Sequence, residues 1–181
     1  MAVAGSGHRW FDVAGRALAV LAVALTAFVS SAGTWLAHAD NLGAINGVFT
    51  ALSNGDWAKT GSVFMDEQTV VSTWTISTTC SMYNICEGTV ASDQGWSASI
   101  STTNGMWYVR REIADWQHCA GGGTATGRQL FRFYPIDVRT GQVQTGSDTF
   151  TGIDRTVTPG GSCGVSTPTV IEMPFRLTRT G

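Results

Sequence analysis

The sequence predicts an all-β protein, most simply an antiparallel up-and-down barrel of about eight strands, with a β-sandwich as the alternative. The first observation is alternation: within residues 105–134, Trp107 and Val109 project to one side while Tyr108 and Arg110 project to the other. A side-chain period of two with one apolar face is typical of antiparallel strands that cover a core on one side. The second observation is composition, since only 13% of the residues are charged and the chain has 22 glycines and 7 tryptophans.

The first 39 residues are expected to be a cleavable export signal. Arg9 and Arg16 precede an unbroken apolar run at 17–29, and Ala37 and Ala39 are small residues at the two positions that signal peptidase reads. This run of about 13 residues is too short to cross about 30 Å of hydrocarbon as a helix. In the alternative, the span extends to roughly 20 residues and remains as an uncleaved N-terminal anchor.

Residues 40–181 are expected to form a single extracytoplasmic domain. Cleavage would take two basic residues from 11 and one acidic residue from 13, which leaves 9 and 12 and a formal charge of −3. Such a balance gives no reason to expect nucleic acid. Because Lys59 is the only lysine, no polybasic segment for anionic lipid is apparent, and membrane contact is expected only through an uncleaved N-terminal segment. A core of this size requires no cofactor.

Alternating segments separated by turn residues define the expected strands. β-branched and aromatic residues, which suit a half-buried pleated surface, are frequent in them. The strands are expected at 47–53, 69–78, 88–92, 96–102, 106–113, 127–135, 142–151 and 169–178.

The segments between these strands carry the turn signals. Asn104-Gly105 predicts a type I′ hairpin, because both residues tolerate positive φ. Residues 58–67 are expected to be irregular, and residues 115–127 to form a long polar, glycine-rich connection. Pro174 lies on the outward face of the last strand and predicts an edge position or a bulge there, since proline donates no ladder hydrogen bond.

The four cysteines, Cys80, Cys86, Cys119 and Cys163, all lie in the expected mature part. An even number outside the cytoplasm indicates two disulfides, although four cysteines permit three pairings. The short loop between Cys80 and Cys86 favours that pair, which leaves Cys119–Cys163. Metal binding is the competing interpretation, but one remaining histidine and the absence of a CxxC motif provide no zinc spacing, so no metal site is expected.

His118 is the residue from which a catalytic site could be built, since histidine is the usual general base in proteins and Glu112 and Asp115 lie close in sequence. No Gly-x-Ser-x-Gly nucleophile motif is present, and Cys119 is expected in a disulfide. An exposed loop histidine is therefore the preferred interpretation, and no catalytic residue is assigned. The glycine-rich stretch 121–128 lacks the lysine of a phosphate loop and precedes a strand, so it is interpreted as a connection.

Arg111 is expected on the apolar face, where a charge needs a partner. Either a bulge shifts the register, or Arg111 pairs with a buried acid or stacks on a tryptophan. Aromatic residues on the inner faces supply core area in any case. If the barrel leaves room for a small apolar ligand, the expected binding residues are Trp74, Trp96, Trp107, Arg111, Phe131 and Phe133.

Several segments together resemble a family of small secreted mycobacterial proteins: NGDWAKT, STWTISTTC, DQGWSA, GMWYVRR, TATGRQLFRFYP, GSCG and MPFRLTR. More distantly, the pattern is similar to extracytoplasmic portions of some mycobacterial envelope proteins, including certain receptor kinases. The resemblance covers nearly all of residues 45–179. It implies export, an extracytoplasmic β domain and paired cysteines, and it brings no established catalytic residues.

These observations lead to three functional hypotheses. The first is a non-enzymatic protein, secreted or held in the cell wall, that binds an apolar or envelope-derived small molecule or a protein partner. The second is an extracytoplasmic interaction or sensor module without a cavity, with a functional loop at 115–127. The third is a small hydrolase that uses His118.

Overall fold

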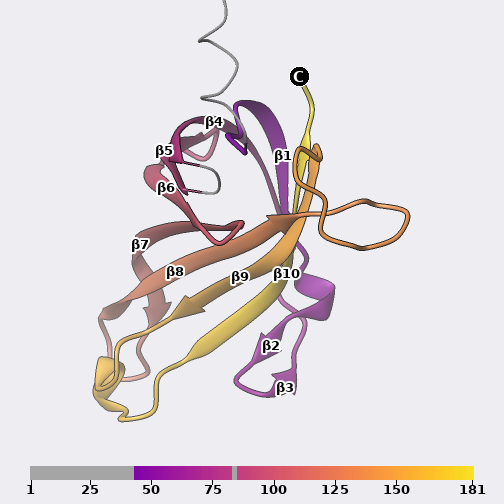
Figure 1. Cartoon of the computed structure of the whole chain (residues 1–181). Coiled ribbons are helices and arrows are strands. Elements are labelled where there is room, and N and C mark those ends of the chain that lie inside the picture. The colour runs from indigo at the N-terminus through magenta and orange to yellow at the C-terminus, as the bar shows by residue number, and fades with distance from the viewer. Residues whose placement is uncertain (1–42, 83–84) are drawn as a thin grey trace, which may run out of the picture. The chain divides into compact units, whose positions relative to one another are not determined.

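The computed structural model describes residues 43–82 and 85–181 (Figure 1). The expected signal at 1–39, with its cleavage site at Ala37 and Ala39, lies outside the described residues. The chain divides into two units, Met1–His38 and Ala39–Gly181, and all of the described strands belong to the second. In the described ranges, no helix is long and apolar enough to cross a membrane.

In the described part of the chain, eight strands close into an antiparallel barrel, which confirms the predicted fold class. Each strand pairs with the next, and β10 returns to pair with β1 from Phe49↔Arg179 to Ser53↔Phe175. The strands are β1 (Gly47–Ser53), β4 (Val70–Met82), β5 (Ile85–Ser92), β6 (Ser97–Thr103), β7 (Met106–His118), β8 (Thr124–Pro135), β9 (Thr149–Val157) and β10 (Val170–Arg179).

Two short strands lie outside the barrel ring, in the segment that was expected to be irregular. After the 3-10 turn η1 (Gly55–Trp57), β2 (Lys59–Thr60) pairs with Ile171 and Glu172 of β10, and β3 (Val63–Phe64) pairs with β2. The expectation was wrong for these residues. β1 ends opposite Phe175, so the first half of β10 has no partner strand from β1. β2 forms backbone hydrogen bonds with this half of β10, although the sequence of β2 shows no alternation.

Local turn chemistry agrees with the sequence at two positions. Asn104 and Gly105 both have positive φ, 52° and 75°, and connect Thr103 to its partner Met106. The carbonyl of Pro174 accepts a bond from the Asn54 amide at 2.9 Å, where β1 has already ended. The missing N–H of Pro174 therefore falls at a sheet margin, as an edge position requires.

Two expected segments were wrong. β7 continues to His118 and β8 begins at Thr124, so the connection between them is residues 119–123 and not 115–127. Likewise, most of the expected strand 142–151 belongs to the projecting loop before β9, drawn in orange in Figure 1. The Asp137 carboxylate accepts bonds from the amides of Arg139 and Thr140, and these bonds stabilise a turn there.

Aromatic side chains fill the interior of the barrel. Trp74 lies at the centre, with its ring centroid 4.9 Å from Phe131 and 5.3 Å from Phe175. Phe49 and Phe133 are fully buried against Phe150 and Phe175, at centroid distances of 5.5 to 6.1 Å. These distances lie in the favourable range for aromatic pairs, so the middle of the barrel is a packed core.

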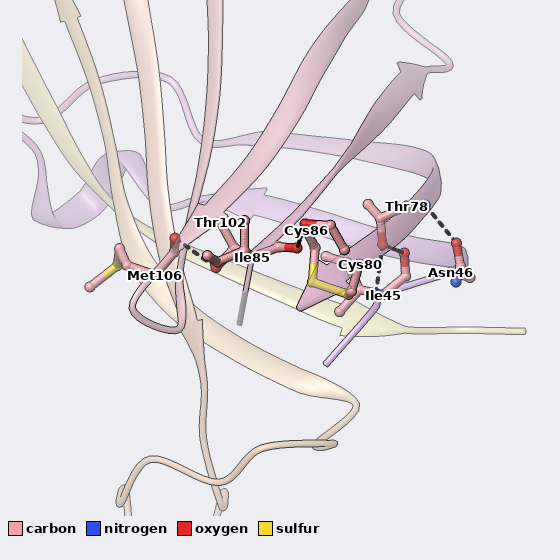
Figure 2. The surroundings of a disulfide bond; sticks show 9 residues. Ile45, Asn46, Thr78, Cys80, Ile85, Cys86, Thr102 and Met106 are labelled. Carbon is pink, nitrogen blue, oxygen red and sulfur yellow. Dashed lines mark hydrogen bonds between the residues drawn. A yellow bond between two sulfur atoms is a disulfide. The ribbon is translucent and has the colours of Figure 1, made fainter. Parts of the chain in front are cut away.

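Both predicted disulfides are present. Cys80–Cys86 joins facing residues of β4 and β5, and Figure 2 shows its surroundings. At this end, the Thr78 hydroxyl bonds both the amide and the carbonyl of buried Ile45, each at 2.9 Å, so Ile45 covers the core there. Cys119–Cys163 joins the β7–β8 connection to the β9–β10 connection, at the tips of the longer strands.

Candidate ligand site at one end of the barrel

A cavity of about 450 Å³ lies at the barrel end where β1 finishes and β4 begins. This is the end opposite the Cys80–Cys86 disulfide, because it is lined by the first residues of β4. Its aromatic lining consists of Trp74, Trp96, Trp116, Phe131 and Phe175, and its aliphatic lining includes Val70, Ile113, Ile171 and Met173. Polar side chains line it as well, among them Glu67, Gln68 and Gln94.

A chain of hydrogen bonds crosses the barrel at the base of this cavity. Asp154 of β9 is 2% exposed, and its two carboxylate oxygens accept bonds from Ser53 Oγ at 2.7 Å and Gln129 Nε2 at 2.8 Å. The amide oxygen of Gln129 in turn accepts a bond from Arg111 Nε at 2.6 Å. Four strands thus contribute one side chain each, and the buried carboxylate has the partners that burial requires.

Arg111 stacks on a tryptophan, one of the outcomes that its position predicted. Its guanidinium carbon lies 4.3 Å from the centre of the Trp96 ring, a favourable cation–π arrangement. Gln129 connects Arg111 to the buried acid, Asp154. The hydrogen bond of Arg111 uses Nε, so its two terminal amino groups are not needed for it.

Burial dominates the electrostatics of this pair. The pKa of Asp154 is raised above its ordinary value by burial, while the bonds from Ser53 and Gln129 and the charge of Arg111 act in the opposite direction. The pKa of Arg111 is lowered by burial and raised by Asp154. The base of the cavity therefore holds a carboxyl group that takes up a proton more readily than an exposed one, next to a cation.

A bulge in β7 builds one wall of the cavity. Ile113 faces Gly127 and Gln117 faces Ala125, so that three residues of β7 lie opposite one of β8. Asp115, in the bulge, has a φ of 54°, and Trp116 comes to lie over Gly127. A Cβ added to Gly127 would be 2.7 Å from Trp116 Cγ. Because this distance is too short for a carbon–carbon contact, the indole can occupy this position only if residue 127 is glycine.

The indole nitrogen of Trp96 is buried and has no hydrogen-bond partner in the described part of the chain. Buried N–H groups without a partner are rare in proteins and lose the free energy of hydration. Trp96 also lines the cavity. Because this nitrogen is itself buried, it is not accessible to a molecule in the cavity.

The six expected binding residues do not gather in one place. Trp74, Trp96, Arg111 and Phe131 line the cavity. Trp107 lines a different hollow, of about 410 Å³, near Asn104 and Gly105 at the other end of the barrel. Phe133 is fully buried within the core.

Sequence reasoning did not assign most of the residues that line the site, among them Ser53, Trp116, Gln129 and Asp154. Gln129 could have been found, because it shares its face with Phe131 in an alternating strand. Asp154 was hidden because the inward positions of β9 beside it are Gly152 and Thr156, while the outward ones include Ile153 and Val157. Trp116 lies within the bulge of β7, and no sequence signal predicted that bulge.

Each residue of the hydrolase hypothesis is exposed or engaged in another contact. His118 is exposed at the end of β7, and Glu112 forms an ion pair with Arg128 at 3.7 Å. Asp115 accepts a hydrogen bond from the Thr124 hydroxyl, and Cys119 is in a disulfide. Within the described residues, no group of three or more His, Cys, Asp or Glu side chains could hold a metal ion.

Comparisons with known proteins bear on the fold. No protein-family model and no curated sequence matches this chain. Among solved structures, the chain is similar to the monomer form of the M. tuberculosis PknI sensor domain, with a TM-score of 0.51 and 14% identity. The match covers 76% of this chain and 88% of that one. At this identity, the likeness shows that the two share a fold, and the resemblance to small mycobacterial secreted proteins stays a prediction.

The two disulfides fit an extracytoplasmic location, where paired cysteines form and persist.

Proposed function

We propose that this protein is an extracytoplasmic recognition domain of the sensor type, secreted or held at the cell envelope, that binds a small amphipathic molecule in the cavity at the end of its barrel. The observation that carries the proposal is the juxtaposition of aromatic and aliphatic side chains with one fixed cation. Trp116, Ile171 and Met173 offer contacts to an apolar body, while Arg111 offers donors to a polar head.

The size of the cavity is consistent with this role. Small-molecule sites measure about 300 to 1,000 Å³ and combine apolar walls with a few fixed polar groups. The cavity, of about 450 Å³, falls within this range. Because the middle of the barrel is packed with aromatic rings, the ligand would lie above Trp74 and not within the barrel.

A carboxylate is the head group that these donors favour. The guanidinium of Arg111 is fixed by Trp96 and Gln129, and planar guanidinium groups bind carboxylates through two parallel hydrogen bonds. Asp154 would oppose a second anion when it is ionised. Its raised pKa reduces this opposition at acidic pH, because a larger fraction of the group is then neutral.

A fluorescent fatty acid carrying a dansyl group tests the proposal on the full chain. Binding should increase the dansyl emission, and Trp116→Ala should weaken the affinity about tenfold, since a large aromatic wall is lost. Arg111→Met should weaken it comparably by removing the partner of the head group. Trp57→Ala is the matched control, because Trp57 is 62% exposed on η1 and does not line the cavity.

Two results would count against the cavity as the recognition site. One is the absence of any emission change with the unmodified protein. The other is an equal loss of affinity in Trp57→Ala and Trp116→Ala, which would indicate adsorption to exposed aromatic surface.

A further inference from the structure

The outer face of the barrel carries a cluster of arginines that is not visible as a run in the sequence. Leu130 of β8 has Arg128 and Arg132 two residues away along its own strand. Across the sheet, Leu130 pairs with Arg110 of β7 on one side and with Arg155 of β9 on the other. Leu130 is thus the centre of four arginines, one in each direction, which we call the arginine cross.

All four arginines of the cross are exposed, and Leu130 between them is half-buried. A wide, open groove of about 640 Å³ lies on this face and is lined by Arg110, Arg128, Leu130 and Arg155. Three of the four arginines of the cross therefore line the groove, together with Glu112, while Arg132 lies outside it. A ligand seated there would have an apolar floor and guanidinium groups around it.

The arginine cross is only weakly neutralised by the protein itself. Arg128 lies 3.7 Å from Glu112, and both side chains are well exposed; Arg155 lies 3.5 Å from Glu172, and these two side chains are partly exposed. Ion pairs at the surface contribute little to stability, so a better partner can displace them. With four cations and two carboxylates, the face is positive on a chain whose formal charge is −2.

The spacing of the cross indicates how many anionic groups a ligand needs. β7 and β9 are two strand spacings apart, about 10 Å, and Arg128 and Arg132 are about 14 Å apart along β8. Arginines spread over this area can pair with more than one phosphate group at the same time. Arginine is the side chain best suited to phosphate, because its planar fork donates two parallel hydrogen bonds.

The chemistry of this face favours a soluble ligand over a lipid bilayer. In the described part of the chain, the large apolar side chains that are exposed lie elsewhere, including Trp57 and Phe64 beside and on the β2–β3 hairpin. Around the cross, Leu130 and its outward apolar neighbours Ile153 and Val157 are all half-buried, so none of them stands out as an exposed anchor for hydrocarbon. We propose that the arginine cross binds a soluble ligand carrying two or more phosphate groups. This site is separate from the cavity and does not depend on the function proposed for it.

Calorimetric titration of the full chain with inorganic pyrophosphate tests this inference. Arg110→Gln/Arg155→Gln removes two opposite arms and should weaken binding about tenfold or more. Arg139→Gln/Arg176→Gln is the matched control: it changes the formal charge equally at two exposed arginines outside the cross, and should alter affinity less than about twofold. Glu112→Gln/Glu172→Gln should tighten binding, because it removes the competing carboxylates.

Three outcomes would overturn the inference. The first is no heat of binding with pyrophosphate. The second is an equal loss of affinity in both arginine pairs, since this would indicate attraction by overall charge. The third is binding to vesicles of anionic phospholipid that requires the cross, together with no binding of pyrophosphate, which would make the face a membrane contact.

Discussion

Asp154 shows how one buried residue can determine the chemistry of a barrel end. It has two hydrogen-bond donors, from Ser53 and Gln129, yet burial still raises its pKa. The folded protein therefore holds this proton at a pH at which the unfolded chain, with a value near 3.9, has released it. Between the pKa of the unfolded chain and the higher pKa of the folded protein, the folded state binds more protons than the unfolded state. The free energy of unfolding therefore falls as pH rises through this range.

Asp154→Asn is expected to remove this component of the pH dependence. The amide keeps the shape of the side chain and can exchange hydrogen bonds with Ser53 and Gln129 if their donors and acceptors reorient. Urea unfolding between pH about 4 and pH about 7 should show a wild-type stability that declines relative to the variant as pH rises. If the free energy of unfolding of the wild type instead rises relative to that of Asp154→Asn as pH increases, the pKa of Asp154 is not raised by folding.

At residue resolution, the sequence was informative where alternation was regular. It placed Arg111 on the inner face and named tryptophan stacking and a buried acid as its partners. It could not identify the acid, because the pairing of Arg111 with Gln129 and of Phe131 with Asp154 depends on the register of β7, β8 and β9. Register between strands is set by the whole sheet.

Among the elements, the extended tips of β7 to β10 form the walls of the cavity. The Cys119–Cys163 disulfide joins the two connections there, across a sequence separation of 44 residues. Cys119→Ala/Cys163→Ala should therefore reduce the free energy of unfolding by about 4 kcal/mol, as expected for a loop of this length. Denaturant unfolding measures this. A loss below about 1 kcal/mol would mean that strand pairing alone holds the tips together.

The contact between Gly127 and Trp116 gives a second prediction at this scale. In Gly127→Ala, the new Cβ would meet Trp116 Cγ at 2.7 Å and Thr156 Cγ2 at 2.8 Å, so the indole must move away from the wall. Affinity for the dansyl fatty acid should fall about fivefold, or roughly 1 kcal/mol. Gly121→Ala is the control, since its Cβ would enter open space. Unchanged binding in Gly127→Ala would show that Trp116 is not part of the site.

Element boundaries were predictable where side chains alternate and turns carry their own residues. β1 was predicted with its exact bounds, and the Asn104-Gly105 turn was placed correctly. The strand expected at 142–151 was misplaced because β9 lacks a clear apolar face in its sequence. Polar Asp154 and Thr156 point inward, while apolar Ile153 points outward. β2 was not predicted because it has only two residues. A strand this short, which pairs with the free side of β10, shows no alternation of apolar and polar side chains.

For the whole molecule, closure of the ring through β1 and β10 separates two surfaces with different chemistry. The inner surface is aromatic at the centre and polar at one end, where the cavity lies. The outer surface of β7 to β9 carries the arginine cross. The sequence predicted no polybasic segment. In the folded protein, arginines from three strands meet because alternate residues of neighbouring strands share a face.

The resonances of the tryptophan indoles provide the most direct test of the cavity as the recognition site. Trp96 and Trp116 line it, Trp107 lines the hollow at the other end, and Trp57 is exposed. In ¹⁵N-labelled full chain titrated with the dansyl fatty acid, the indole N–H signals of Trp96 and Trp116 should shift while those of Trp57 and Trp107 stay in place. Shifts confined to Trp57 or Trp107 would contradict a ligand site at this end of the barrel.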